Sequence, residues 1–236
     1  MRFDVVTLFP EAFEGFLKIG LVGRALAEGR AAVHLCNLRD FGIGRHRSVD
    51  DTPYGGGSGM IMRVDVVVAA IESCEAQAPQ GFHRVLLTPQ GAPFTQKKAQ
   101  ELAERQAIML VCGRYEGFDD RVRSHVSEEL SLGDFVMTGG EVAAMAVIDA
   151  STRLLPGVLG NEASIVEESH SPSTGGLLEY PQFTRPAAFR GVAVPDVLQR
   201  GNHAEIARWR RDEAMRRTAE RRPDLWRQFS TGREGS

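Results

Sequence analysis

The chain of 236 residues has few cysteines and no cysteine motif. Cys36, Cys74 and Cys112 are odd in number, widely spaced and set in apolar surroundings. No CxxC or clustered Cys/His spacing accompanies them, which excludes a structural zinc site and a disulfide framework of the usual kinds. The pattern predicts buried free thiols in a reducing compartment, and we expect a cytoplasmic protein.

Long apolar runs and nucleotide motifs are also missing. The apolar stretches are far shorter than the roughly 18 residues of a membrane span, and no signal peptide pattern opens the chain. Residues 49–60 hold four glycines in five positions but lack the Gly-Lys-Ser/Thr ending of a P-loop, which argues against a nucleoside triphosphate site. The same glycines would admit an RNA backbone or an unstacked base, or simply form a flexible surface loop.

Strands alternating with helices predict a parallel α/β sheet. The expected strands are 3–9, 33–38, 84–88, 108–112 and 134–137, and the expected helices are 10–18, 65–76, 96–105, 119–126 and 141–155, with a loop over 42–60. After residue 159 the composition changes, and 160–176 is typical of a mobile linker. Two Arg-rich helices follow at 202–217 and 220–229, with Ile206, Trp209, Leu225 and Trp226 as packing anchors.

The net charge of −3 hides an asymmetry. From Arg185 to the end, 12 arginines face 7 acidic side chains, a balance of +5, so the 16 basic and 24 acidic residues of 1–184 give −8. A basic tail on an acidic body is compatible with a polyanionic partner. A solvated helical face is the alternative interpretation.

Three glycine-containing loops follow apolar runs, at residues 84–91, 108–119 and 132–141. Glycine allows backbone to approach a ligand or other backbone closely, and ligands of open α/β sheets lie at the carboxyl ends of strands. The loops therefore predict one pocket lined mostly by main chain. Glu116 would receive a cationic group or a hydroxyl there, and Asp119 would cap the following helix.

Short motifs rich in Gly, Pro and Arg run along nearly the whole chain. They are Leu8-Phe-Pro10, Ser48-Val-Asp-Asp51, Pro53-Tyr-Gly-Gly-Gly57, Gly59-Met60, Pro89-Gln-Gly91, Cys112-Gly-Arg-Tyr-Glu-Gly117, Gly133-Asp134, Gly139-Gly-Glu141, Pro156-Gly-Val-Leu-Gly160, Tyr180-Pro181, Thr184-Arg-Pro186 and Arg221-Arg-Pro-Asp224. Together they resemble the bacterial tRNA (guanine-N1)-methyltransferase family, TrmD, of the SPOUT class of RNA methyltransferases.

The resemblance implies a SPOUT-type parallel sheet with a deep trefoil knot at about 85–141, followed by a small all-helical domain. It implies a methyltransferase domain over 1–160, an interdomain linker over 161–176 and a helical tRNA-binding domain over 177–236. Family members are homodimers whose active sites lie at the subunit interface. The methyl donor would be S-adenosylmethionine, with no resident metal and Mg²⁺ as a further cofactor to consider.

The resemblance also assigns the site residues. Those expected to bind the methyl donor are Leu87, Thr88, Pro89, Gln90, Gly91, Gly113, Tyr115, Glu116, Ser131, Leu132, Gly133, Asp134, Phe135, Val136, Met137, Gly139 and Gly140. Those expected to contact tRNA are Asp50, Tyr54, Gly55, Gly56, Gly57, Ser58, Gly59, Met60, His170, Arg185, Arg208 and Arg211. The basic helices that also carry Arg210, Arg216 and Arg217 would face tRNA phosphates. His170 is equally typical of a mobile surface histidine.

The implied reaction is methyl transfer to N1 of guanosine 37 of tRNA, next to guanosine 36. A general base is needed to remove the N1 proton, and Glu168 stands where the family commonly has Asp, with Glu167 as the fallback. Arg153 would stabilise charge on O6, although a lone arginine at a helix end usually caps carbonyls or covers apolar surface.

Other departures from the family pattern are Ser58, where proline is usual, and Phe135 and Met137, where tyrosine and leucine are usual. Two alternatives stay open. One is a SPOUT enzyme with another target, such as a ribose 2′-O or ribosomal RNA methyltransferase. The other is a non-catalytic RNA-binding protein that keeps the fold.

Overall fold

A computed structural model describes residues 1–78, 80–160 and 168–234 of the chain. The chain divides into two compact units, residues 1–160 and residues 161–236. The first unit holds a parallel sheet with helices, and the second holds two α-helices with a short hairpin.

Five strands form the sheet of the first unit in the order β2-β1-β6-β5-β7, and every neighbouring pair is parallel. The strands are β1 (Arg2–Thr7), β2 (Ala32–Asn37), β5 (His83–Pro93), β6 (Ala107–Cys112) and β7 (Glu128–Ser131). Every residue of the central strand β6 is buried, as is usual for a parallel strand covered on both faces. The predicted α/β fold with a parallel sheet is confirmed.

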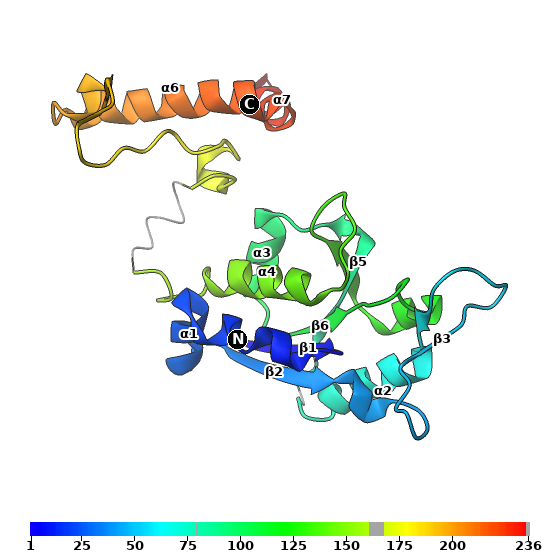
Figure 1. Cartoon of the computed structure of the whole chain (residues 1–236). Coiled ribbons are helices and arrows are strands. Elements are labelled where there is room, and N and C mark those ends of the chain that lie inside the picture. The colour runs from blue at the N-terminus through cyan, green and yellow to red at the C-terminus, as the bar shows by residue number, and fades with distance from the viewer. Residues whose placement is uncertain (79, 161–167, 235–236) are drawn as a thin grey trace. The chain divides into compact units, whose positions relative to one another are not determined.

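Helices cover both faces of this sheet, with α3 and α4 on one side and α2 on the other (Figure 1). The helices are α1 (Gly20–Ala27), α2 (Val64–Glu75), α3 (Gln96–Ala103) and α4 (Glu141–Thr152). Because side chains alternate along a strand, Val5 joins an apolar cluster with Val147 of α4, while Val6 joins a second cluster with Val66 of α2. These two clusters fix the central strands and the loops that leave them.

The strand predicted at 134–137 is wrong, because the fifth strand is β7, which starts with two glutamates. Glu128 accepts a hydrogen bond from His83 at 2.7 Å and pairs with Lys98 at 2.9 Å, so its partners make a charged edge strand stable. The more apolar residues that follow lie in a loop, with Phe135 55% and Val136 83% exposed. Tertiary contacts thus outweigh the local apolar pattern.

The helix predicted at 10–18 is also wrong in form. It consists of two short 3₁₀ helices, η1 (Pro10–Phe13) and η2 (Phe16–Lys18), and helix α1 follows unpredicted. The glycines in this stretch obscured α1 in the sequence. Gly20 has a φ of +60° where the chain turns, and a Cβ at Gly23 would lie 2.6 Å from the carbonyl carbon of Lys18. The helix predicted at 119–126 is the 3₁₀ helix η4 (Asp120–His125).

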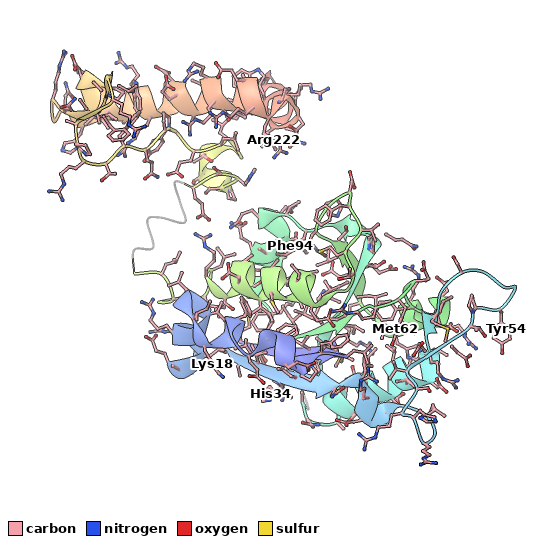
Figure 2. The ribbon with its side chains drawn as sticks, in the orientation of Figure 1. Lys18, His34, Tyr54, Met62, Phe94 and Arg222 are labelled. Carbon is pink, nitrogen blue, oxygen red and sulfur yellow. The ribbon has the colours of Figure 1, made fainter. Side chains whose placement is uncertain are left out.

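The predicted loop over 42–60 contains one short strand. β3 (Asp50–Asp51) pairs antiparallel with β4 (Ile61–Met62). The chain between these two strands projects from the first unit (Figure 1). Tyr54 is fully exposed, and Figure 2 shows it at the outer part of this projection.

The second unit contains α6 (His203–Arg221), α7 (Pro223–Glu234) and a hairpin of β8 (Ala188–Phe189) and β9 (Val192–Ala193). The sequence analysis predicted an all-helical domain here. The hairpin shows that this prediction is wrong. The four residues predicted to anchor the two helices by packing are all half-buried: Ile206, Trp209, Leu225 and Trp226. The ring of Trp209 lies 6.4 Å from that of Phe183.

No helix among residues 1–78, 80–160 and 168–234 combines the length and the apolarity that a membrane crossing requires. The three cysteines are free thiols, of which Cys74 and Cys112 are buried and Cys36 is half-buried.

A substitution at Gly91 tests the close packing of the end of β5 against β7. The pairing of β5 with β7 shifts between Leu87 and Ala92, and a Cβ at Gly91 would lie 2.5 Å from the backbone nitrogen of Leu130. Gly91→Ala is expected to lower the free energy of unfolding by about 2 kcal/mol, because backbone must move to admit the methyl group. Urea titration measures this. Gly15→Ala, which has no atom within 4 Å of the new methyl, is the control, and equal stability of the two variants would contradict the packing argument.

Candidate functional site

Three loops meet at the carboxyl ends of β5, β6 and β7, which are neighbours in the sheet. They enclose a pocket of about 380 Å³. Its lining residues are Leu87, Thr88, Pro89, Gln90, Gly113, Arg114, Tyr115, Glu116, Gly117, Phe118, Arg123, Leu130, Ser131, Leu132, Phe135, Val136, Met137, Thr138, Gly139, Gly140 and Ala143. The three loops that the sequence singled out therefore do form one pocket.

The residues predicted to bind a methyl donor all line this pocket except Gly91, Gly133 and Asp134. Gly91 packs instead against the backbone of β7. Gly133 exchanges hydrogen bonds with the Ser131 hydroxyl, which donates to its carbonyl at 2.9 Å, and Asp134 is exposed. Among the lining residues that were not assigned individually, Arg114, Gly117, Phe118 and Thr138 belong to the three predicted loops, while Arg123, Leu130 and Ala143 lie outside them.

Main chain brings the third loop against the end of β6. The N–H of Gly140 donates to the carbonyl of Gly113 at 2.9 Å. A Cβ at Gly140 would lie 2.8 Å from the Cα of Cys112, so no larger residue fits without a backbone shift. The loop that leaves β7 thus passes the end of β5 and contacts the strand beyond it, which closes one side of the pocket.

A buried carboxylate anchors the same contact. Glu141, the first residue of α4, is only 2% exposed. It pairs with the Arg114 guanidinium at 2.8 Å and accepts a hydrogen bond from the Thr7 hydroxyl at 2.8 Å. Arg114 also donates to the Thr138 carbonyl at 3.2 Å and lies 4.5 Å from the centre of the Phe9 ring. One charge pair therefore ties β1, the loop after β6 and the start of α4 together.

The second arginine of the wall, Arg123, is held in a similar way. It donates to the side-chain carbonyl of Gln90 at 2.6 Å and to Asp120 at 2.6 Å, and it pairs with Glu129. Gln90 is thereby fixed at the pocket edge. Each of the two guanidinium groups in the wall already has a carboxylate partner.

The glycine-rich projection joins the pocket through β4. The N–H of Glu116 donates to the Met60 carbonyl at 3.0 Å, and that of Met62 donates to the Gly117 carbonyl at 2.9 Å. The Glu116 side chain lies so close to Gly59 that a Cβ there would be 2.5 Å from its Cγ. These contacts join the pocket wall to the base of the projection.

Two titratable groups on the loop after β6 carry shifted pKa values. Partial burial raises the pKa of the Tyr115 hydroxyl, and the nearby Asp50 carboxylate adds to the shift. Hydrogen bonding from Arg121 lowers the pKa of Asp119 to about 2. Asp119 accepts from the Arg121 backbone N–H at 3.0 Å at the start of η4, so its predicted capping role is confirmed.

The residues predicted to contact tRNA lie at exposed or half-buried positions. In the projection, Tyr54 to Gly59 are exposed, while Asp50 and Met60 are half-buried. In the second unit, His170, Arg185, Arg208 and Arg211 are exposed. Within the described residues no group of three or more His, Cys, Asp or Glu side chains could hold a metal ion.

The two residues predicted to act on the acceptor belong to different units. Arg153 follows the last residue of α4, and its N–H donates to the Asp149 carbonyl at 3.1 Å. Glu168 is half-buried in the second unit, where its carbonyl accepts from Ser171 at 3.2 Å. Glu167 lies outside the described residues.

Residues 168–177 form a hydrogen-bonded turn. The N–H of His170 donates to the Leu177 carbonyl at 3.1 Å, and that of Gly176 donates to the Ser171 carbonyl at 3.0 Å. His170 adopts a φ of +67°, uncommon for a residue with a side chain. Glu168, the residue predicted as the base, is therefore the first residue of a turn that hydrogen bonds hold in place.

A parallel α/β sheet with a pocket at the carboxyl ends of its strands is the arrangement in which open α/β proteins bind small ligands. The family model described as tRNA (Guanine-1)-methyltransferase TrmD matches residues 1–228. The chain belongs to this family and is a methyltransferase.

Relatives named tRNA (guanine-N(1)-)-methyltransferase match nearly the whole chain. The protein of Sorangium cellulosum is 66% identical, covering 98% of this chain and 96% of its own length. That of Roseobacter denitrificans is 56% identical, with 94% and 91% covered. That of Geobacillus kaustophilus is 50% identical, with 95% and 91% covered.

Glu141→Gln tests the buried charge pair. The substitution leaves the Arg114 guanidinium without its counter-charge, and we expect the free energy of unfolding to fall by about 3 kcal/mol. Urea titration of both variants and the unmodified chain measures the change. Glu28→Gln, which removes an exposed carboxylate paired with Arg30, should leave the unfolding midpoint unchanged. Equal effects of the two substitutions would show that burial of Glu141 is not what stabilises the loops.

Proposed function

We propose that the chain transfers the methyl group of S-adenosylmethionine to N1 of guanosine 37 in tRNA, where guanosine 36 precedes it, in the cytoplasm. The observation that carries the proposal is the family match over residues 1–228 on a chain whose three loops form one pocket. The proposed organisation is a methyltransferase domain over 1–160, an interdomain linker over 161–176 and a tRNA-binding domain over 177–236.

The charges of the pocket suit a cationic methyl donor. Arg114 and Arg123 are neutralised by Glu141 and by Asp120 and Glu129, while Glu116 presents an exposed carboxylate at the wall. The volume of about 380 Å³ lies within the common range for small-ligand sites. When bound, S-adenosylmethionine supplies a methyl group already activated by its sulfonium. Backbone groups of the three loops would hold it in line with the acceptor.

The proposed pocket is knotted, with the knot at about 85–141. The contact of Gly140 with Gly113 supports this, because the chain leaving edge strand β7 must cross β5 to reach β6. Knots are rare exceptions to the usual topology of proteins. A knotted loop would keep its main-chain donors in place without help from large side chains.

The acceptor chemistry would rest on Glu168 and Arg153. Guanine N1 carries a proton, and the Glu168 carboxylate would remove it as the general base. Negative charge then moves to O6, where the Arg153 guanidinium would stabilise it. Glutamate is one methylene longer than the aspartate usual in the family, and the turn that begins at Glu168 provides a defined support for the longer side chain.

In the proposed homodimer each active site combines residues of both subunits. The donor pocket and Arg153 belong to the first unit, while Glu168, His170 and the arginines of α6 belong to the second. Arg185, Arg208 and Arg211 would contact phosphates, which gives affinity without sequence choice. The exposed projection around Tyr54 would read the flipped target base and its neighbour.

Transcripts that differ at two positions test the function. We expect labelled methyl transfer to a tRNA transcript with guanosines at positions 36 and 37, and loss of most transfer when either is replaced. Discrimination arises because a site built for the hydrogen-bonding edge of one base rejects others. Mapping the product to N1 completes the assay. Equal methylation of all transcripts, or product at a ribose 2′-oxygen, would point to another RNA methyltransferase.

Mixing two inactive variants tests the shared site. Arg153→Gln and Glu168→Gln are each expected to keep S-adenosylmethionine binding and to lose most transfer. After subunit exchange, random pairing should restore about a quarter of the sites if each site takes Arg153 and Glu168 from different subunits. The control mixes two differently tagged Glu168→Gln preparations. Exchange without recovery would place both residues in one subunit or remove one of them from the mechanism.

A further inference from the structure

A second concave site lies entirely within the second unit. It is a notch of about 440 Å³ lined by Ser169, Leu178, Glu179, Tyr180, Gln182, Arg217 and Arg221. One wall is the segment that follows Glu168, and the other is the last part of α6. None of these residues has a place in the methyl-donor pocket.

Two hydroxyl groups hold the walls of the notch in place. Thr218 is fully buried, and its hydroxyl accepts from the Leu178 N–H at 2.9 Å and donates to the Ala214 carbonyl at 2.7 Å. The hydroxyl of Ser169 accepts from the Glu179 N–H at 2.9 Å. The segment is therefore held to α6 and to its own beginning, and the space between them has a fixed shape.

Two arginines and one glutamate line the notch, so its lining carries an excess of positive charge. Arg217 and Arg221 are four residues apart on α6 and so lie on one face of the helix. Neither makes an ion pair or a side-chain hydrogen bond within the described part of the chain. The carboxylate of Glu179 is the acidic group in the lining, and it accepts a hydrogen bond from the Gln182 amide.

Neighbouring arginines at the end of α6 and directly after it behave differently. Arg216 pairs with Glu213 at 2.6 Å and Glu220 at 2.9 Å, and Arg222 donates to Asp224 at 2.9 Å. Figure 2 places Arg222 near the junction of α6 and α7. The contrast shows that α6 has acidic partners for some arginines but leaves the two in the notch available for a ligand.

We infer that the notch binds one phosphodiester of the tRNA strand close to the target guanosine, an inference that rests on the proposed function. Two guanidinium groups match a phosphate group, because each can donate parallel hydrogen bonds to its oxygens. Ser169 lines the notch and directly follows Glu168. Since consecutive Cα atoms are about 3.8 Å apart, a phosphate held there belongs within about two nucleotides of the base on which Glu168 acts.

The role of such a phosphate is positioning. It would fix the strand on the element that carries Glu168, so the carboxylate and the flipped base approach each other in one geometry. The notch contributes no group to proton removal. Its loss should therefore raise the KM for tRNA and leave binding of S-adenosylmethionine, which takes place in the first unit, unchanged.

Two double variants separate the notch from general charge. Arg217→Gln with Arg221→Gln removes the notch charges, while Arg216→Gln with Arg222→Gln removes the same charge from two ion-paired arginines, one in α6 and one directly after it. We expect the first to raise the KM for tRNA about tenfold and to lower the slope of log affinity against log salt by about 1. The second should change both much less. Equal effects of the two variants would overturn the inference.

Neutral linkages identify the phosphate. A series of synthetic tRNAs is prepared, and each carries one methylphosphonate at a different linkage around position 37. Binding of each tRNA is measured for the unmodified enzyme, the notch variant and the Arg216 and Arg222 variant. One linkage within about two nucleotides of the target should weaken binding to the unmodified enzyme and to the Arg216 and Arg222 variant, but have no further effect on the notch variant. Additive losses at every linkage, or a coupled linkage far from position 37, would refute the site.

Two readouts keep this result distinct from failure of the proposed function. The unmodified enzyme is assayed for methyl transfer on the all-phosphate transcript, and only its inactivity would count against the function itself. Circular dichroism and calorimetric binding of S-adenosylmethionine show that the notch variant is folded. Arg217→Lys with Arg221→Lys, which keeps the charges but loses the planar donors, should restore the salt slope and only part of the affinity.

Discussion

The pocket of the first unit depends on the buried carboxylate of Glu141. Removing a charge from water is costly unless partners replace the solvent, and here Arg114 and Thr7 do so. Because these partners come from the loop after β6 and from the end of β1, the first residue of α4 can be buried only when all three segments have assembled. The pocket wall and the folded sheet are therefore one structure.

This arrangement separates two tasks in the proposed reaction. Backbone of three loops would hold the methyl donor, and side chains outside the pocket would act on the acceptor. Arg114 and Arg123 illustrate the first task, since both use their charge on the protein itself and leave the pocket free of excess positive charge. The arginines of α6 illustrate the second task, because some pair internally and others remain available to a polyanion.

The sheet and the meeting of the three loops could be predicted from the sequence, since buried parallel strands give apolar runs and their carboxyl ends share one edge. The charged strand β7 could not, because His83 and Lys98, which stabilise Glu128, are distant in sequence. The role of Glu141 was hidden for the same reason, as Thr7 lies 134 residues away from it. Helix α1 was missed because its glycines resemble breakers, although Gly23 is required by contact with Lys18.

The glycines of the pocket wall also limit how the chain can change. Gly113, Gly139 and Gly140 of the wall each lie where a single added carbon would come within 3 Å of another atom. A compound that competes for this pocket through main-chain contacts would leave few substitutions that weaken it without also disturbing the fold. Escape by point mutation would then have to arise at the exposed residues of the wall, such as Phe135 and Val136, where side chains can vary without moving the backbone.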